Sequence, residues 1–196
     1  MPVEADGPIG WWSPDPRGVL EPDQIHVSRS MSRIIDRYEI RVDTEFEAVL
    51  DGCADPARPH GWIDDRIRDA YLHLHRLGWC HSVEAWRDEQ LAGGLYGLAI
   101  GGLFAGESMF SNETNGSKAA LIGLARGLDQ GMSDGSGRLI DVQWCTKHLA
   151  SMGVTEISRR QYHQRLVEVL AMEPSPMFEV EISSHLHQHV RWRPDD

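Results

Sequence analysis

Several features are scarce in this 196-residue sequence, and each scarcity excludes a class of protein. The longest apolar stretch, residues 91–104, is shorter than the roughly 20 residues that cross a bilayer, and it contains five glycines. The first ten residues lack the basic and apolar regions of a secretory signal peptide. The three cysteines, Cys53, Cys80 and Cys145, have neither CxxC spacing nor the pattern of a disulfide framework. We therefore predict a cytoplasmic protein without membrane contact and without a metal site.

Lysine is also scarce. Only Lys118 and Lys147 stand among 19 basic residues, and 30 acidic residues give a net charge of −11. Such an acidic protein is not expected to attract nucleic acid through its overall charge. The other 17 basic residues are arginines, whose planar guanidinium groups match phosphate and carboxylate. Any contact with nucleic acid must therefore come from a local arginine cluster.

One such cluster follows from spacing. Arg29, Arg33 and Arg37 recur every four residues, so they share one face if residues 28–37 form a helix. Two interpretations remain open. The three side chains are a solvated face paired with the abundant acids, or they are a phosphate-binding stripe on an otherwise acidic protein.

The length and composition fit one globular domain. Hydrophobic residues make up 41% and charged residues 25% of the sequence, which is close to globular averages. A chain of this size buries enough surface to fold without disulfides. Residues 1–27, rich in proline and glycine, are predicted to be an irregular lead-in. We expect residues 28–171 to form the domain and residues 172–196 to form a loose C-terminal tail.

Hydrophobic periodicity alternates between the strand and the helix period, which predicts an α+β fold. Thr44 and Glu47 have the spacing of a capping box at a helix start. The predicted strands cover residues 38–42, 81–86, 91–100, 103–110, 139–144 and 155–158. The predicted helices cover residues 45–54, 63–77, 117–131, 146–152 and 161–171.

Six glycines interrupt the predicted strands between residues 93 and 106. Glycine weakens a strand unless another backbone or a ligand must approach closely. Glu107 follows these glycines in an apolar context. Its carboxylate therefore contacts a ligand, or it caps the segment that follows.

The segment LIDVQ at residues 139–143 places two polar side chains on a predicted strand. Asp141 and Gln143 point to one face, and Ile140 and Val142 point to the other. Polar groups on a covered face are costly unless they are hydrogen-bonded. The pair is therefore a buried structural pair bonded to a neighbouring loop, or a polar patch that handles an amine or a proton.

Several longer segments together carry a family resemblance. The chain resembles the bacterial leucyl/phenylalanyl-tRNA–protein transferases over most of residues 11–170. The matching segments are WWSPDPR (11–17), HVSRSMSR (26–33), GWI (61–63), AYLHLHRLG (70–78), HSVEAW (81–86), GGLYGLAIGGLFAGESMFS (93–111), SKAAL (117–121), LIDVQW (139–144) and HLASMGVTEISR (148–159).

The resemblance implies a mixed sheet flanked by helices, similar to the acetyltransferase (GNAT) fold. It implies transfer of Leu, Phe or Met from aminoacyl-tRNA to the N-terminal Arg or Lys of an acceptor protein, which marks that protein for degradation. Forming an amide from an aminoacyl ester is downhill, so we expect no nucleotide, metal or other cofactor. We expect the protein to be a monomer.

The resemblance also assigns roles to residues. It makes Asp141 and Gln143 the catalytic pair and Glu107 a further functional acid. It places Trp62 near the 3′ adenosine of the tRNA, and it favours tRNA phosphates as partners of Arg29, Arg33 and Arg37. It predicts a pocket for the donor side chain formed by Leu95, Phe104, Met109, Leu121, Leu124 and Ile140, although these six residues are equally suited to a core.

The sequence departs from the family in one respect: it begins close to the tryptophan pair, where we expect a small N-terminal domain to come first. This motivates an alternative, a shortened relative that acts on a small-molecule amine or binds tRNA without catalysis. A coenzyme A-dependent acetyltransferase is a second alternative, but residues 111–117 are acidic and contain a single glycine, unlike a pyrophosphate-binding loop.

Overall fold

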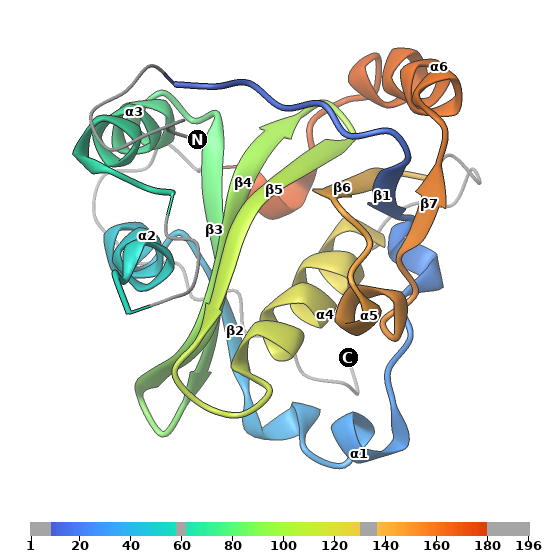
Figure 1. Cartoon of the computed structure of the whole chain (residues 1–196). Helices are drawn as coiled ribbons and strands as arrows, with labels where there is room; N and C mark the ends of the chain where they lie inside the picture. Colours follow the sequence, from blue (N-terminus) through green and yellow to red (C-terminus); the bar gives the residue numbers. More distant parts are fainter. Residues whose placement is uncertain (1–8, 58–61, 130–136, 180–196) are drawn as a thin grey trace.

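The computed structural model describes residues 9–57, 62–129 and 137–179. Its centre is a seven-stranded sheet in the order β2-β3-β4-β5-β6-β1-β7, with helices on both faces (Figure 1). The strands are β1 (Arg17–Leu20), β2 (Glu39–Val42), β3 (Cys80–Arg87), β4 (Gln90–Ile100), β5 (Leu103–Ser111), β6 (Leu139–Gln143) and β7 (Thr155–Ile157). This architecture confirms the predicted α+β, GNAT-like mixed sheet.

The pairing between β5 and β6 divides the sheet into two antiparallel parts. β2 to β5 form one part, and β6, β1 and β7 form the other. β5 and β6 run parallel and pair at only three positions, from Leu103 opposite Leu139 to Ala105 opposite Asp141. Both strands continue beyond this point without pairing to each other. The two strands therefore separate directly after Ala105 and Asp141, which leaves an opening in the sheet at this point.

Three helices cover the sheet. α4 packs on β3 and β4 from one face, and α2 and α3 lie on the other (Figure 1). A short helix, α5, follows β6, and the end of α6 packs against the start of β5. The helices are α1 (Arg29–Ser32), α2 (Phe46–Ala54), α3 (Asp65–Arg76), α4 (Gly116–Asp129), α5 (Lys147–Ala150) and α6 (Arg159–Leu170). None of the described helices is both long enough and apolar enough to span a bilayer.

Gly93 of β4 and Gly116 allow the start of α4 to pack closely on the sheet. At Gly116, the first residue of α4, an added Cβ would lie 2.1 Å from the carbonyl oxygen of Ala92. At Gly93 an added Cβ would lie 2.6 Å from the carbonyl carbon of Gly116. The helix start thus rests directly on the strand backbone. The close approach that the glycine run predicted is made here by the protein's own backbone.

The N-terminal part differs from the prediction in two ways. Residues 17–20 form β1, which lies between β6 and β7, so the expectation of an irregular lead-in was wrong for these residues. Residues 28–37 do not form one helix. α1 ends at Ser32, and a separate 3-10 turn covers Ile35–Arg37, because the backbone leaves the helical region at Ile34.

The predicted capping box at Thr44 was also wrong. Helix α2 has Glu45 as its N-cap, without a side-chain cap. The Thr44 hydroxyl instead donates to the fully buried carboxylate of Glu84, which also accepts hydrogen bonds from the Glu45 backbone, the Ser82 hydroxyl and the Trp86 indole. A buried acid surrounded by four donors thus fixes the start of α2.

The first part of the predicted tail is packed. Arg138 donates to the carbonyl oxygens of Glu173 and Pro174. The ring of Phe178 stacks on His81 at 4.6 Å and on Phe104 at 5.5 Å between ring centroids. Residues 172–179 therefore belong to the folded unit, and the remainder of the predicted tail lies outside the described residues.

Candidate active site

Asp141 is the most highly bonded side chain at the opening between β5 and β6. It is 1% exposed; Oδ1 accepts two hydrogen bonds and Oδ2 accepts three, the longest from Arg17 Nε at 3.1 Å. Oδ1 accepts from Arg17 Nε and from the Gln143 backbone, both at 2.9 Å. Oδ2 accepts from Arg17 Nη2 and the Tyr162 hydroxyl, both at 2.6 Å. The partners come from β1, α6 and β6 itself, so, of the two interpretations, the one in which the pair bonds to a neighbouring loop was wrong in its choice of partner.

Gln143 ends β6 in an unusual backbone conformation. Its φ is +60°, in the left-handed region that costs a non-glycine residue about 1–2 kcal/mol. The pairing of β1 with β6 shifts register between Gly18 and Val19, opposite this point. An added Cβ at Gly18 would lie 2.8 Å from the backbone of Trp144 and Cys145. The hydrogen bond from the Gln143 backbone to Asp141 holds this turn.

The orientation of the Gln143 carboxamide follows from its partner. Its nitrogen donates to the Gly106 carbonyl at 2.6 Å, and a carbonyl can only accept. The carboxamide oxygen must therefore face away from Gly106. Within the described part of the chain that oxygen has no hydrogen-bond partner, so it remains free to accept one.

Glu107 lies inside β5, directly after Gly106, and is half-buried. β5 continues to Ser111, so the interpretation of Glu107 as a cap for the next segment was wrong. Burial raises the pKa of its carboxyl group, and the charge of Asp141 raises it further. A hydrogen bond from Tyr71 and the charge of Arg17 oppose this rise. Glu107 is thus an acid held close to a second carboxylate and a guanidinium.

The two partners of Asp141 remain in the forms that donate hydrogen bonds. Burial lowers the pKa of Arg17, but its hydrogen bond to Asp141 and the charges of Asp141 and other nearby groups together outweigh this effect, and the net shift is upward. Burial raises the pKa of the Tyr162 hydroxyl, and its bond to Asp141 adds to the rise. The guanidinium carbon of Arg17 also lies 4.9 Å from the centre of the Tyr162 ring. These contacts hold Arg17, Asp141 and Tyr162 as one unit.

The six predicted donor-pocket residues do come together. They lie in the hydrophobic cluster between the sheet and α4. Five of them are no more than 3% exposed, whereas Met109 is half-buried. This arrangement fits a core as well as the floor of a pocket. The six are Leu95, Phe104, Met109, Leu121, Leu124 and Ile140.

Other predicted residues lie away from Asp141. Trp62 is half-buried on the segment before α3, and it forms no hydrogen bond or ring contact within the described residues. Arg29, Arg33 and Arg37 are exposed, on or beside α1, at the opposite end of the molecule from α6 (Figure 1). In the described part of the chain none of these three arginines is paired with an acid.

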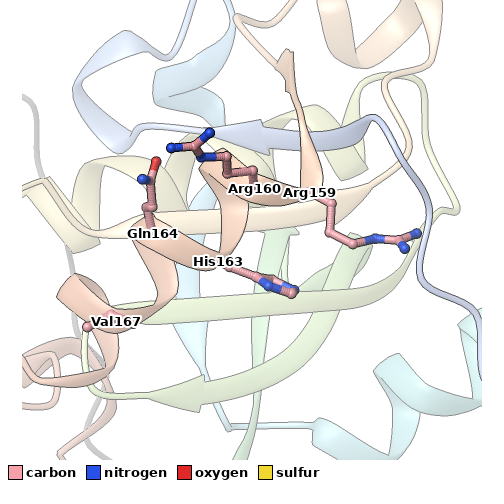
Figure 2. Close-up of a pocket in the computed structure, with 5 residues that line it drawn as sticks. All are labelled: Arg159, Arg160, His163, Gln164 and Val167. Carbon is pink, nitrogen blue, oxygen red and sulfur yellow. The ribbon is translucent and has the colours of Figure 1, made fainter.

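A shallow hollow of about 520 Å³ lies on the outer side of α6 (Figure 2). It contains none of the residues bonded to Asp141. Among the described residues, no three His, Cys, Asp or Glu side chains are grouped to hold a metal ion. The hollow is lined by Arg159, Arg160, His163, Gln164 and Val167.

Sequence reasoning missed Arg17 and Tyr162. A buried Asp on a strand requires donors, but the sequence does not say which ones, because the two partners lie 124 and 21 positions away. The available signal for Arg17 was its place at the end of the segment WWSPDPR. Tyr162 gave no signal beyond its position on a predicted helix.

Comparison with known proteins gives one consistent result. The sequence model of the leucyl/phenylalanyl-tRNA protein transferase family matches residues 19–167. A protein of this name from Azoarcus sp. is 48% identical over 90% of this chain and 75% of its own length. Those from Zymomonas mobilis and Pseudomonas putida are each 49% identical, over 81% and 87% of this chain. The matched regions cover 59% and 76% of their own lengths.

Proposed function

Because the chain belongs to the leucyl/phenylalanyl-tRNA–protein transferase family, we propose that it moves Leu, Phe or Met from aminoacyl-tRNA to the N-terminal Arg or Lys of a protein. The observation that carries the proposal is the family match across residues 19–167, which includes the residues at the opening between β5 and β6. The extended N-terminus would then serve as a degradation signal.

The reaction replaces an ester with an amide. The nitrogen of the acceptor α-amine attacks the carbonyl carbon of the aminoacyl ester, and the ribose oxygen leaves with the proton that the amine loses. The amine must first be neutral, and its reference pKa of about 7.7–8.0 leaves a fraction neutral at physiological pH. The protein's task is to hold the amine roughly 3–3.5 Å from the carbonyl carbon.

The free carboxamide oxygen of Gln143 suits this task. An N–H of the neutral amine would donate to that oxygen, which leaves the nitrogen lone pair directed elsewhere, toward the ester. Asp141 supports this arrangement by bonding the Gln143 backbone at 2.9 Å. We assign Gln143 the role of orienting the amine. Asp141 is the second member of the catalytic pair and acts by holding Gln143.

Glu107 suits the basic acceptor. An acceptor that begins with Arg or Lys brings a positive side chain, and Glu107 is a half-buried acid one residue from the anchor of Gln143. A cation at this position would offset the burial of the carboxylate. We assign Glu107 to the acceptor side chain or its ammonium group.

The donor side chain would enter on the α4 side of the sheet. Met109 is the half-buried member of the apolar set, and its flexible thioether accommodates Leu, Phe and Met alike. We propose that Met109 meets the donor and that the buried members form the floor. Trp62 would contact the 3′ adenosine, and Arg29, Arg33 and Arg37 would contact tRNA phosphates. The exposure of these arginines and their lack of acidic partners in the described residues support that role.

The test is transfer of radiolabelled Leu from charged tRNA to a peptide that begins with Arg, without nucleotide. A peptide identical except for an N-terminal Ala is the control. We expect label on the Arg peptide and little on the Ala peptide. Label that stays on tRNA would contradict the proposal, and label appearing on an added small amine instead would favour the small-molecule alternative.

We also propose that the protein acts as a cytoplasmic monomer. The three cysteines are free thiols, which suits the reducing cytoplasm. Light scattering during gel filtration tests the monomeric state. A mass near 22.1 kDa is expected, and twice that value would contradict it.

A further inference from the structure

We infer that Arg17 and Tyr162 are positioning residues of the transfer site, and that they hold Asp141 as a fixed anion that orients Gln143. The inference rests on the proposed function, because it concerns the same site. It differs from a mechanism in which Asp141 takes a proton from the amine, directly or through Gln143.

The occupancy of the carboxylate carries the inference. Four donors fill the two oxygens of Asp141 at 2.6–2.9 Å, and the side chain is 1% exposed. A carboxylate has about four acceptor sites, so these four donors occupy all of them. An incoming amine would have to displace Arg17 or Tyr162 to reach it.

The same bonds connect Asp141 to the substrate-facing group. Arg17 and Tyr162 fix the carboxylate from β1 and α6, and the carboxylate fixes the backbone nitrogen of Gln143. That backbone has a φ of +60°, a conformation that needs support from its surroundings. Loss of either donor would therefore loosen the turn and move the Gln143 carboxamide, although neither donor touches the substrate.

The two mechanisms predict opposite effects for Tyr162→Phe. If Asp141 is the base, loss of one donor makes it a stronger base, and the transfer rate on the pH plateau stays the same or rises. If Asp141 is an anchor, loss of the donor misplaces Gln143, and transfer becomes slower at every pH. We expect the single-turnover rate of Tyr162→Phe to fall about tenfold, with KM for the Arg peptide within twofold of the wild-type value.

Arg17→Lys provides an independent measurement. It keeps the positive charge but loses the planar fork that bonds both carboxylate oxygens. We expect a fall of about tenfold or more in rate. The double variant Arg17→Lys with Tyr162→Phe should lose less than the product of the two single losses, because both act through Asp141.

Matched controls separate positioning from general stability. Tyr38→Phe removes a hydroxyl that donates to the Thr114 carbonyl at 3.0 Å, and Arg165→Lys alters an arginine paired with Glu21 at 3.0 Å. Both controls should keep wild-type rates. Circular dichroism confirms that each variant is folded.

Three outcomes would overturn the inference: a Tyr162→Phe rate equal to or above wild type, a pH–rate profile shifted by that change, or rate losses in the controls equal to those at Arg17 and Tyr162. Wild-type transfer is measured first. If the wild type does not transfer, the proposed function fails and the inference fails with it. If the wild type transfers and the variants match it, the inference alone fails.

Discussion

The side-chain nitrogen of Gln143 donates to the carbonyl oxygen of Gly106 at 2.6 Å, across the point where β5 and β6 stop pairing. This bond replaces the missing strand pairing at the edge of the opening. It joins the end of β6 to the residue before Glu107. The relative position of the two assigned groups, the carboxamide of Gln143 and the carboxylate of Glu107, therefore depends on this contact.

Gln143→Ala should lower the single-turnover transfer rate about 100-fold, since it removes the group assigned to orient the amine and the bond to Gly106. Quench-flow measurement with charged tRNA and an Arg peptide checks this. Gln164→Ala, which changes an exposed glutamine on α6, is the control and should stay within twofold of wild type. A loss of only twofold in Gln143→Ala would contradict the assignment.

Glu107→Gln should stabilise the folded protein at neutral pH while it lowers transfer. Burial raises the pKa of Glu107 in the folded state above its unfolded value. The carboxyl group therefore favours folding below its unfolded pKa, and this contribution is lost as pH rises through the folded pKa. The free energies of unfolding in urea should agree below the unfolded pKa, diverge as pH rises through the folded pKa, and then differ by a constant amount. The exposed change Glu156→Gln should show no such divergence.

Replacing Arg29, Arg33 and Arg37 together by Gln should weaken tRNA binding and flatten its salt dependence. Three phosphate contacts contribute roughly −2 to −3 to the slope of log affinity against log salt concentration. The slope of the variant should be less steep by that amount. Filter binding at two salt concentrations measures it. A control triple replaces arginines already paired with acids, Arg66, Arg68 and Arg87. An unchanged slope in the first triple would place the tRNA elsewhere.

Glu84→Gln should destabilise the protein by about 3 kcal/mol, because an amide would turn its own donor toward groups that all donate. Glu84 is fully buried and accepts from Glu45, Ser82 and Trp86, besides Thr44. Denaturant unfolding measures the change, with the exposed Glu156→Gln as control. A loss below 1 kcal/mol would mean that the donors find other partners.

Local patterns predicted most of the secondary structure. The strand period around residues 81–110 and the glycines at 101 and 102 placed the β3-β4-β5 meander correctly. The helical spacing of Ile67, Tyr71 and Leu74 did the same for α3. These elements are specified by nearby residues, so a pattern within one segment is sufficient to find them.

The failures share a different cause. β1 is four residues long and is stabilised by pairing with β6 and β7, which lie more than 110 residues away along the chain. Thr44 and Glu47 have the spacing of a capping box, but the Thr44 hydroxyl donates its hydrogen bond to the buried carboxylate of Glu84 instead. At the site, the polar pair was predicted, whereas its partners Arg17 and Tyr162 depend on how the sheet and α6 meet. Contacts between distant segments decided each case.

The ring of Phe178 stacks against His81 and Phe104. The codons near the 3′ end of the gene therefore encode part of the core, although they encode none of the residues assigned to the site. A stop codon directly after Ala171 would delete that ring and the carbonyl partners of Arg138, and it would open the core beside the fully buried Phe104. Such a nonsense mutation would therefore destabilise the core although every residue assigned to the site precedes it. Any shortened version made for crystallisation should therefore keep the chain through Glu179.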